Sequence, residues 1–478
     1  MKRFAGLILV FMMFLAALPA LADTTRTSGD FRYTLKSNGT ATIVGYTGSG
    51  DIIIPQMLDG YTVTAIGDSA FDRETKSYNT RSVTLPDTIK SIGAFAFRNM
   101  NIISINLPNG LEDIGKGAFV GCNSIAYRMS ANHPSFAVID GALYNKSQKK
   151  LIWGKEDATI PEGIKIIGDY ACYKVPNCGI NENGIVLPST IEEIGDYAFY
   201  GNEYSIKVPS DKSETKFIKP VARSEYPHMS ATTSYVHELK WGSNLRKIGS
   251  YAFANIWINT DDSSLILSIP STVSEIGEGC FSGFFGFSFF SSYPVTISIP
   301  KDSHLRNIPT KAFYNEKGLK ASLRPIICDA PIVTIGDYAF YGTYVVNFNM
   351  QNVKTLGKGA FMETTQRASI TIPACLKIIP EDAFKNARTL KHDIVISNGV
   401  EVIEANALDV NPTNSKGNVF SLSPIRLPAS LTSIAPDAFR DDAEFIVERG
   451  SYAYRWAEEN ARNYSIDGEK QNLDWLNN

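Results

Sequence analysis

The residue types best suited to catalysis or metal binding are few and widely spaced in this sequence. Its five histidines are His133, His228, His237, His304 and His392. No two of them are four residues apart, and neither His-Glu-x-x-His nor Cys-x-x-Cys occurs, so the sequence predicts no zinc site. Such isolated histidines are expected to be structural or surface residues.

Other signatures of catalysis and cofactor binding are missing as well. The chain has no Gly-x-x-x-x-Gly-Lys-Ser/Thr and no Gly-x-Ser-x-Gly. Glu192 and Glu193 stand between Ile191 and Ile194, where we expect both carboxylates to face solvent. Asp261–Asp262 is too sparse for calcium, which takes about six to eight oxygen ligands. We therefore predict no catalytic residues, no metal and no cofactor.

Six cysteines offer the remaining reactive groups: Cys122, Cys172, Cys178, Cys280, Cys328 and Cys375. An even number in an exported chain permits disulfides. Most of them are instead expected to be free core residues, because cysteine is among the most often buried residue types. Cys172 with Cys178 is the one local pair that we predict as a possible disulfide.

A repeated sequence motif, called the phrase below, determines where all of these residues lie in the fold. Leu-Pro-x-x-Ile/Leu-x-x-Ile-Gly-x-x-Ala-Phe recurs with few changes at Leu85–Phe97, Leu107–Phe119, Leu187–Phe199 and Ile269–Phe281. Thirteen units can be marked by their closing residues, which are Phe71, Phe97, Phe119, Cys172, Phe199, Phe253, Phe281, Phe313, Phe340, Phe361, Phe384, Leu408 and Phe439. Such self-similarity predicts a solenoid of stacked coils.

Each part of the phrase has a physical reading. The alternation of apolar and polar residues, as in Val83-Thr84-Leu85, predicts a half-buried strand. Successive strands are expected to stack in parallel. The following proline ends that strand, and the next two apolar residues return to the core as a shorter extended segment. The glycine, as at Gly93 and Gly249, suits either a positive φ or a close approach between coils. Pro380 at this position rules out a strict need for positive φ. The closing Phe is expected to stack into an aromatic spine.

The outward positions of the first strand are the best candidate for a binding surface. They form a column of mostly small, uncharged side chains: Thr84, Asn106, Val186, Ser268, Ser298, Thr371, Val395 and Arg426. Solenoids bind partners through such extended surfaces, and hydroxyl groups can bond to a polypeptide or a glycan without strong charge selection. The competing interpretation is that the column contains ordinary strand formers that face solvent.

The repeat resembles the BspA-like, or Treponema pallidum-type, leucine-rich repeat family over about residues 51–439. Asn132–Phe136 followed by Asp140–Tyr144 also resembles an insertion common in that family. The resemblance implies a horseshoe-like solenoid, an extracellular location and a role in binding proteins or surfaces. The chain departs from many members through its long 200–240 insertion and its lack of a recognisable surface-anchor module.

The chain divides into four parts. Residues 1–22 are predicted to be a secretory signal peptide, since Lys2 and Arg3 precede an apolar stretch and a small-x-small site ends at Ala22. Residues 23–50 form an N-terminal β cap, in which Asn38-Gly39 predicts a hairpin with a type I′ turn. Residues 51–440 form a leucine-rich repeat solenoid of the α/β horseshoe class, mostly β, with about 13–16 coils of short parallel strands. Residues 441–478 form a cap with a helix within Gly450–Asn463.

Two insertions and an aromatic segment interrupt the repeat. The insertions lie near 122–158 and 200–240, where the steps from residue 119 to 172 and from 199 to 253 are each about two periods. For 200–240 an irregular extra coil is favoured over a recognition loop. The aromatic segment contains Phe284, Phe285, Phe287, Phe289, Phe290 and Tyr293. It is either an exposed interaction patch or, as we favour, the filling of a widened coil.

Charge and targeting limit the classes of function. Without Lys2 and Arg3 the chain has 44 basic and 49 acidic residues. It therefore lacks the excess of basic residues that nucleic acid binding requires. No later stretch is apolar for long enough to span a membrane. The favoured hypothesis is a non-enzymatic binding or adhesion protein, secreted or located at the cell surface or in the periplasm after cleavage near Ala22. Its partner would be a host or matrix protein or glycan. The alternatives are a structural cell-envelope component without a discrete ligand and, less favoured, a carbohydrate-active enzyme with its site in an insertion.

Overall fold

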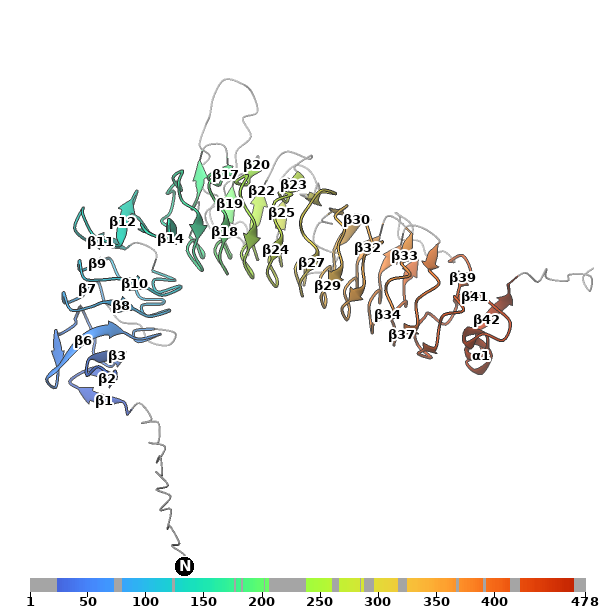
Figure 1. Cartoon of the computed structure of the whole chain (residues 1–478), viewed down its shortest axis with the longest axis horizontal. Helices are drawn as coiled ribbons and strands as arrows, with labels where there is room; N and C mark the ends of the chain where they lie inside the picture. Colours follow the sequence, from blue (N-terminus) through green and yellow to red (C-terminus); the bar gives the residue numbers. More distant parts are fainter. Residues whose placement is uncertain are drawn as a thin grey trace, which may run out of the picture.

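The computed structural model of the chain is a curved, elongated solenoid of about 14 coils, as the repeat predicts (Figure 1). It describes residues 24–72, 80–122, 125–175, 178–181, 184–201, 203–205, 238–259, 266–283, 285–287, 296–316, 325–366, 369–389, 393–412 and 422–467. Most coils contain two or three short strands. Equivalent strands of successive coils line up in three columns along the arch, called the first, second and third strands.

The first strands and second strands follow the two extended segments of the phrase. The first strands are β4 (Ile52–Ile53), β7 (Ser82–Thr84), β9 (Ser104–Asn106), β11 (Ala126–Arg128), β17 (Gly184–Val186), β20 (Glu238–Lys240), β23 (Ile266–Ser268), β26 (Thr296–Ile299), β28 (Pro325–Cys328), β30 (Tyr344–Phe348), β33 (Ile370–Ile372), β36 (Ile394–Ile396), β39 (Ile425–Arg426), β41 (Glu444–Val447) and β42 (Asn463–Ile466). The second strands are β6 (Tyr61–Ile66), β8 (Ser91–Ile92), β10 (Asp113–Ile114), β14 (Lys150–Trp153), β15 (Ile166–Ile167), β18 (Glu193–Ile194), β21 (Lys247–Ile248), β24 (Glu275–Ile276), β27 (Asn307–Ile308), β29 (Thr334–Ile335), β31 (Thr355–Leu356), β34 (Ile378–Ile379), β37 (Val402–Ile403) and β40 (Ser433–Ile434). The second strands lie along the inner side of the arch and the first strands along its outer side (Figure 1).

The remaining elements are third strands, caps and insertions. Third strands follow the closing Phe and are β19 (Glu203–Ser205), β22 (Trp257–Asn259), β25 (Phe285–Phe287), β32 (Thr365–Gln366), β35 (Arg388–Thr389) and β38 (Asn411–Pro412). The other elements are β1 (Arg26–Ser28), β2 (Phe31–Leu35), β3 (Ala41–Tyr46), β5 (Met57–Leu58), β12 (Phe136–Ile139), β13 (Ala142–Asn145), β16 (Ile180–Asn181) and α1 (Tyr452–Glu459).

One coil illustrates why the phrase folds in this way. In β9 Ile105 is buried, and Leu107 follows it into the core while Asn106 faces outward. Pro108 has no N–H for a ladder and stands just after this strand. Leu111 is then fully buried from the returning side. The expected second extended segment is therefore confirmed as the short strands β8, β10 and their equivalents.

The repeated glycine marks a close approach between coils, and the alternative of a positive φ is wrong. Gly93, Gly249 and Gly277 are not among the residues with positive φ. A Cβ on Gly249 would lie 2.5 Å from the carbonyl carbon of Gly195 in the preceding coil. The left-handed residue stands two positions later, as at Tyr251 with φ of 54°.

The amide of the same glycine also links neighbouring second strands. Gly249 N–H donates to Ile194 O at 2.7 Å, and Gly277 N–H donates to Ile248 O at 2.8 Å. Pro309 and Pro380 occupy this position in two coils and have no N–H to donate. The second-strand sheets end at these places, since β24 does not pair with β27 and β31 does not pair with β34.

The closing phenylalanines form the predicted spine. Phe253, Phe281, Phe313 and Phe340 stack with ring centroids 5.2–5.7 Å apart and ring planes within 13° of parallel. The rings are buried. Offset parallel rings at this spacing add stabilisation beyond the burial of their apolar area.

The buried residues form two cores that meet at the insertion after Phe119. The antiparallel strands β12, β13 and β14 form this junction, and β14 then pairs in parallel with β15. Leu143 and Trp153 belong to the N-terminal core, whereas Tyr144 and Leu151 belong to the C-terminal core. In β13 neighbouring side chains lie on opposite faces, and the register shift against β14 at Leu143 and Tyr144 places Leu151 and Trp153 in different cores although they are two residues apart.

The long step from Phe199 to Phe253 does not contain the expected extra coil. β18 pairs directly with β21, and the rings of Phe199 and Phe253 stack 5.3 Å apart. The two coils are therefore neighbours. By contrast, the step from Phe119 to Cys172 holds an irregular coil that includes β11 and β14. Residues 206–237 lie outside the described residues.

The N-terminal cap contains the predicted hairpin, with a different turn. β2 and β3 pair antiparallel, and β3 pairs in parallel with β6 of the first coils. Gly39 has a φ of 77°, but Asn38 is not among the positive-φ residues, so the turn is not type I′. Asn38 Oδ1 instead accepts from the N–H of Thr40 at 3.1 Å. A single left-handed glycine near the end of the loop is typical of hairpin loops that are longer than two residues.

The C-terminal cap is a short helix followed by a strand. Ser451 caps α1 by accepting a hydrogen bond from Tyr454 N–H, and Trp456 on its buried side packs against Phe439 and Phe445. β42 then adds to the first-strand column beside β41. The helical cap is thus only part of what covers this end. Among the described residues, no helix has the length and apolar character needed to cross a membrane.

A disulfide joins Cys172 and Cys178, whose Cα atoms are 5.9 Å apart. Cys172 is fully buried at the position that Phe occupies in most coils. Because the bridge closes a loop of only six residues, its removal in Cys178→Ala is expected to lower the free energy of unfolding by roughly 2 kcal/mol. Guanidinium denaturation followed by circular dichroism measures this loss.

The control for the disulfide is Cys375→Ala, because Cys375 is a half-buried free thiol. Reductant should destabilise the unsubstituted protein and the Cys375→Ala variant, and should leave Cys178→Ala unchanged. Equal stability of the unsubstituted protein with and without reductant would contradict a stabilising bridge.

Candidate ligand groove on the first-strand sheet

The predicted outward column is divided into short groups by the sheet topology. The register places Thr84 beside Ile53, Ser268 beside Ser298, and Thr371 beside Val395. Val186 lies in β17, where its backbone pairs with Lys240. Arg426 lies in β39, beside Ile446 of β41. The eight positions therefore do not form one continuous row.

The members of this column differ in how freely they face solvent. Thr84, Ser268, Thr371 and Val395 are exposed, and Ser298 is half-buried. Asn106 is tied to the neighbouring coil, since its side chain accepts from Leu85 N–H at 2.6 Å and donates to Leu85 O at 2.9 Å. Arg426 forms an ion pair with Asp467. Asn106 and Arg426 thus have partners within the chain.

A fork in the first-strand sheet creates a groove beside Thr371. Only 21 residues separate Phe340 from Phe361, the shortest step between closing residues. The third and first strands of this coil consequently merge into β30. Its first half pairs with β32, through Tyr344 with Thr365 and Val345 with Gln366. β33 pairs only with β36, so the strands diverge beyond Val345.

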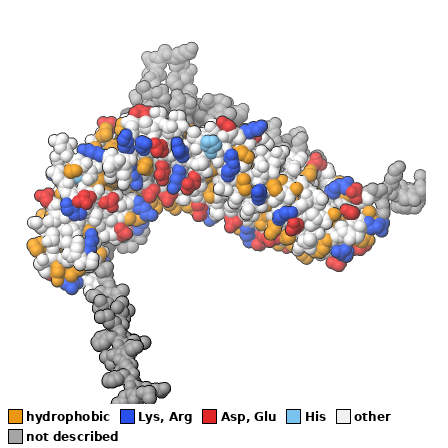
Figure 2. All heavy atoms as spheres, in the orientation of Figure 1, with side chains coloured by type: hydrophobic (Ala, Val, Ile, Leu, Met, Phe, Trp, Pro, Cys, Tyr) orange, Lys and Arg blue, Asp and Glu red, His pale blue; other side chains and the backbone are white. Residues whose placement is uncertain are grey.

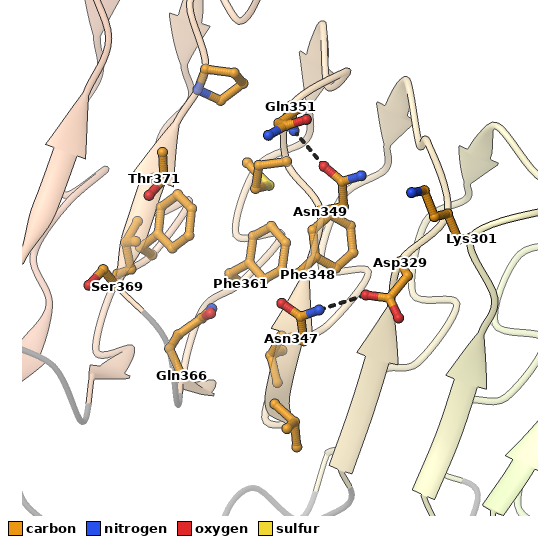
Figure 3. Close-up of a pocket in the computed structure, with 16 residues that line it drawn as sticks. Lys301, Asp329, Asn347, Phe348, Asn349, Gln351, Phe361, Gln366, Ser369 and Thr371 are labelled. Carbon is orange, nitrogen blue, oxygen red and sulfur yellow. Dashed lines mark hydrogen bonds between the residues drawn. The ribbon is translucent and has the colours of Figure 1, made fainter.

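The opening between β30 and β33 is a groove of about 520 Å³, within the range of small-molecule sites. Phe361 and Phe384, from the buried spine, lie at its floor. Phe348 stands edge-on to the rings of Phe340 and Phe361, at 5.2 and 5.4 Å. Asn347, Asn349 and Gln351 lie on one side of the groove, with Gln366, Ser369 and Thr371 on the other (Figure 3).

Hydrogen bonds hold part of this rim in place. The Asn347 amide donates to Asp329 Oδ1 at 2.6 Å, and Asn349 Oδ1 accepts from Gln351 N–H at 3.1 Å (Figure 3). The Gln366 amide donates to Thr364 Oγ1 at 3.1 Å. Within the described part of the chain, the hydroxyls of Ser369 and Thr371 make no hydrogen bond. The groove therefore has both oriented amides and uncommitted hydroxyl groups.

The sequence analysis named Thr371 as an outward strand residue and did not single out the other residues of the groove. The sequence feature that could have revealed the groove is the loss of the strand-ending proline. This position holds Pro300 and Pro373 in two coils, and Asp329 and Asn349 in the two coils between them. Phe348 is also larger than the aliphatic residue or cysteine at the equivalent position of its neighbours, such as Cys328. Departures from a repeat are thus the informative feature.

Two rows of tyrosines form a second surface feature that the sequence analysis missed. Tyr170, Tyr197 and Tyr251 stack with ring centroids 5.0–5.1 Å apart, and Tyr173 stacks on Tyr200 at 5.3 Å. Burial raises the pKa of Tyr251 to about 12, aided by its hydrogen bond to Glu278. Because the ring faces cover one another, these rows present mainly ring edges and hydroxyl groups.

The cysteines and His133 are engaged in structure. Burial raises the pKa of the Cys122 and Cys328 thiols to about 12, so both remain protonated and poorly nucleophilic at neutral pH. His133 is fully buried, and its Nε2 lies 2.9 Å from Pro108 O while its Nδ1 accepts from Ser135 N–H. Within the described ranges, no cluster of three or more His, Cys, Asp or Glu is placed to hold a metal ion.

The predicted aromatic patch lies mostly outside the described residues. Phe284, Phe289, Phe290 and Tyr293 fall there, while Phe285 and Phe287 lie in β25, which pairs in parallel with β22. Charges elsewhere are interspersed over the visible face, with no extended region of one sign (Figure 2). On the inner side they pair across coils, as in Lys165 with Glu192 at 2.6 Å and Lys247 with Glu275 at 3.7 Å.

The repeat matches a described family, and comparison with solved structures gives matches at low sequence identity. Residues 52–151, 155–284, 231–315 and 285–414 match the family described as BspA type Leucine rich repeat region. A leucine rich cell surface protein from Faecalibacterium prausnitzii A2-165 is 19% identical, covers 94% of this chain and 97% of its own, and has a TM-score of 0.36. A leucine-rich repeat protein from Bacteroides ovatus ATCC 8483 is also 19% identical, covers 92% of this chain and 99% of its own, and has a TM-score of 0.38. None of the curated proteins compared matches the chain.

Proposed function

The chain belongs to the BspA-type leucine-rich repeat family, and on that premise we propose that it is an exported, non-enzymatic binding or adhesion protein. It presents its repeat surface to a host or matrix protein or glycan. It acts outside the cytoplasm, either secreted or at the cell surface.

The observation that carries this proposal is the set of exposed, uncharged first-strand positions on a scaffold built from two buried cores. Thr84, Ser268, Thr371 and Val395 are solvent-exposed, and the residues beneath them belong to the two buried cores. A pre-organised surface loses little conformational entropy on binding, which favours affinity. The Cys172–Cys178 disulfide adds support, because disulfides persist in oxidising compartments outside the cytoplasm.

Binding to an extracellular macromolecule is the expected result for residues 23–478 expressed without the predicted signal peptide. Saturable binding should appear either in pull-downs from host matrix proteins or on an array of neutral and acidic glycans. Heat-denatured protein is the control for non-specific adhesion. Absence of binding in both formats would contradict the proposal. Tight retention in the cell envelope together with that absence would favour a structural envelope component.

A further inference from the structure

The groove between β30 and β33 arises from features that set this coil apart from the repeat rule. Proline is replaced by Asp329 and Asn349 in two successive coils, and β30 is the only strand in which the third and first segments are merged among the described coils. These changes place polar side chains where most of the other coils have a strand-ending proline. The result is an opening that reaches the aromatic spine.

The polar groups of the groove suit a ligand that both donates and accepts hydrogen bonds. Asn349 and Gln351 contribute amides, while Ser369 and Thr371 contribute hydroxyls. Amides and hydroxyls act as donors and acceptors alike. Asp329 is already bonded to Asn347, and among the described residues Lys301 is the single basic residue that lines the groove. The site therefore selects weakly for charge.

The same groove contains apolar surface beside these polar groups. Phe348 and Met350 are half-buried and line it, and the edges of the spine rings lie below. A pyranose ring has this combination of properties, since its equatorial hydroxyls surround apolar C–H faces. We propose that the groove binds a neutral saccharide unit of one or two pyranose rings. This assignment rests on the proposed binding function and names the ligand class for one site.

A polypeptide strand fits this geometry less well. Peptides that add to a sheet use main-chain hydrogen bonds along an exposed edge. Here Tyr344 and Val345 already pair with β32, so only the short Asn347–Phe348 end of β30 is open toward β33. A strongly acidic ligand is also disfavoured, because Lys301 is accompanied by the Asp329 carboxylate.

Saturation-transfer NMR with the 23–478 protein tests the assignment. The probes are maltose, cellobiose, lactose and N,N′-diacetylchitobiose, with sialyllactose as an acidic comparator. At least one neutral disaccharide should bind saturably and more tightly than sialyllactose. Thr371→Arg, at an exposed position that lines the groove, should weaken this binding more than tenfold by occupying the opening. Asn349→Ala should weaken it by about two- to tenfold, as expected for a lost hydrogen bond.

Ile378→Arg is the matched control, because Ile378 is 47% exposed in the second strand β34 of the same coil and does not line the groove. Its binding should equal that of the unsubstituted protein, and circular dichroism should show all variants folded. Disaccharide binding that is unaffected by Thr371→Arg would overturn the assignment of the groove. Capture of a polypeptide or acidic glycan without any neutral disaccharide binding would overturn the ligand class and leave the adhesion proposal standing. Absence of all binding would contradict both.

Discussion

Replacing Phe313 with alanine is expected to lower the free energy of unfolding by about 3–5 kcal/mol. Phe313 is 2% exposed, and its ring stacks on Phe281 at 5.6 Å and on Phe340 at 5.2 Å. Alanine would leave a cavity between two coils and remove both stacking contacts. A close-packed interior cannot fully collapse around such a space.

The neighbouring residue Tyr314 supplies the control for Phe313. Tyr314 is half-buried, stacks on Tyr341 at 4.9 Å and contacts the Lys311 ammonium. Tyr314→Ala is expected to cost about 1–2.5 kcal/mol, because the stacking contact adds to a side chain that is only partly buried. Urea denaturation of both variants measures the difference, and an equal loss in the two would contradict the role assigned to the spine.

The consequence of Phe313→Ala should be confined to one part of the arch. Each coil contacts mainly its neighbours, so stability in a solenoid is roughly a sum of local terms. Phe313 belongs to the C-terminal core, which is separated from the N-terminal core by β12, β13 and β14. Hydrogen exchange should therefore accelerate in β26, β27 and their neighbours, while β7–β10 remain protected.

The sequence was sufficient to predict features that every coil shares. Ile105 and Leu107 point inward, Pro108 follows the strand, and the closing Phe stacks, because each column must satisfy the same packing in successive coils. Repetition turns a weak local preference into a strong one. The parallel strands and the spine were predictable for this reason, whereas the hairpin cap was predictable from its own Asn38-Gly39 turn.

Features that depend on the distance between particular coils were not predictable. The steps from Phe119 to Cys172 and from Phe199 to Phe253 are nearly equal in length, yet only the first contains an additional coil. Their lengths alone do not determine which strands pair across them. Pairing depends on which backbone segments find hydrogen-bond partners, as β18 does with β21.

The groove was missed because it depends on residues that break the repeat. Thr371 was predicted as an exposed strand residue, but its surroundings follow from Phe348 and Asn349 in the preceding coil. The side-chain alternation of one strand indicates which positions face outward. It does not indicate whether the next strand lies beside it, and here β33 does not pair with β30.

A second large effect is expected when Gly249 is replaced by alanine, because the glycine position is a close approach between coils. The added Cβ would lie 2.5 Å from Gly195 C and 2.6 Å from Asp196 N. Both are backbone atoms, so no side-chain rotation relieves the contact. The coils must separate instead, which weakens the 2.7 Å hydrogen bond from Gly249 N–H to Ile194 O. We expect a loss of about 3 kcal/mol in the free energy of unfolding, at the upper end of the cost of overpacking.

Gly163→Ala separates this steric effect from backbone conformation. Gly163 has a φ of +93°, and a Cβ there would meet no atom within 4 Å. Its substitution should cost about 1–2 kcal/mol, the usual strain of a left-handed residue. Thermal and guanidinium denaturation of the two variants compare the effects. A smaller loss for Gly249→Ala than for Gly163→Ala would refute the close-approach role.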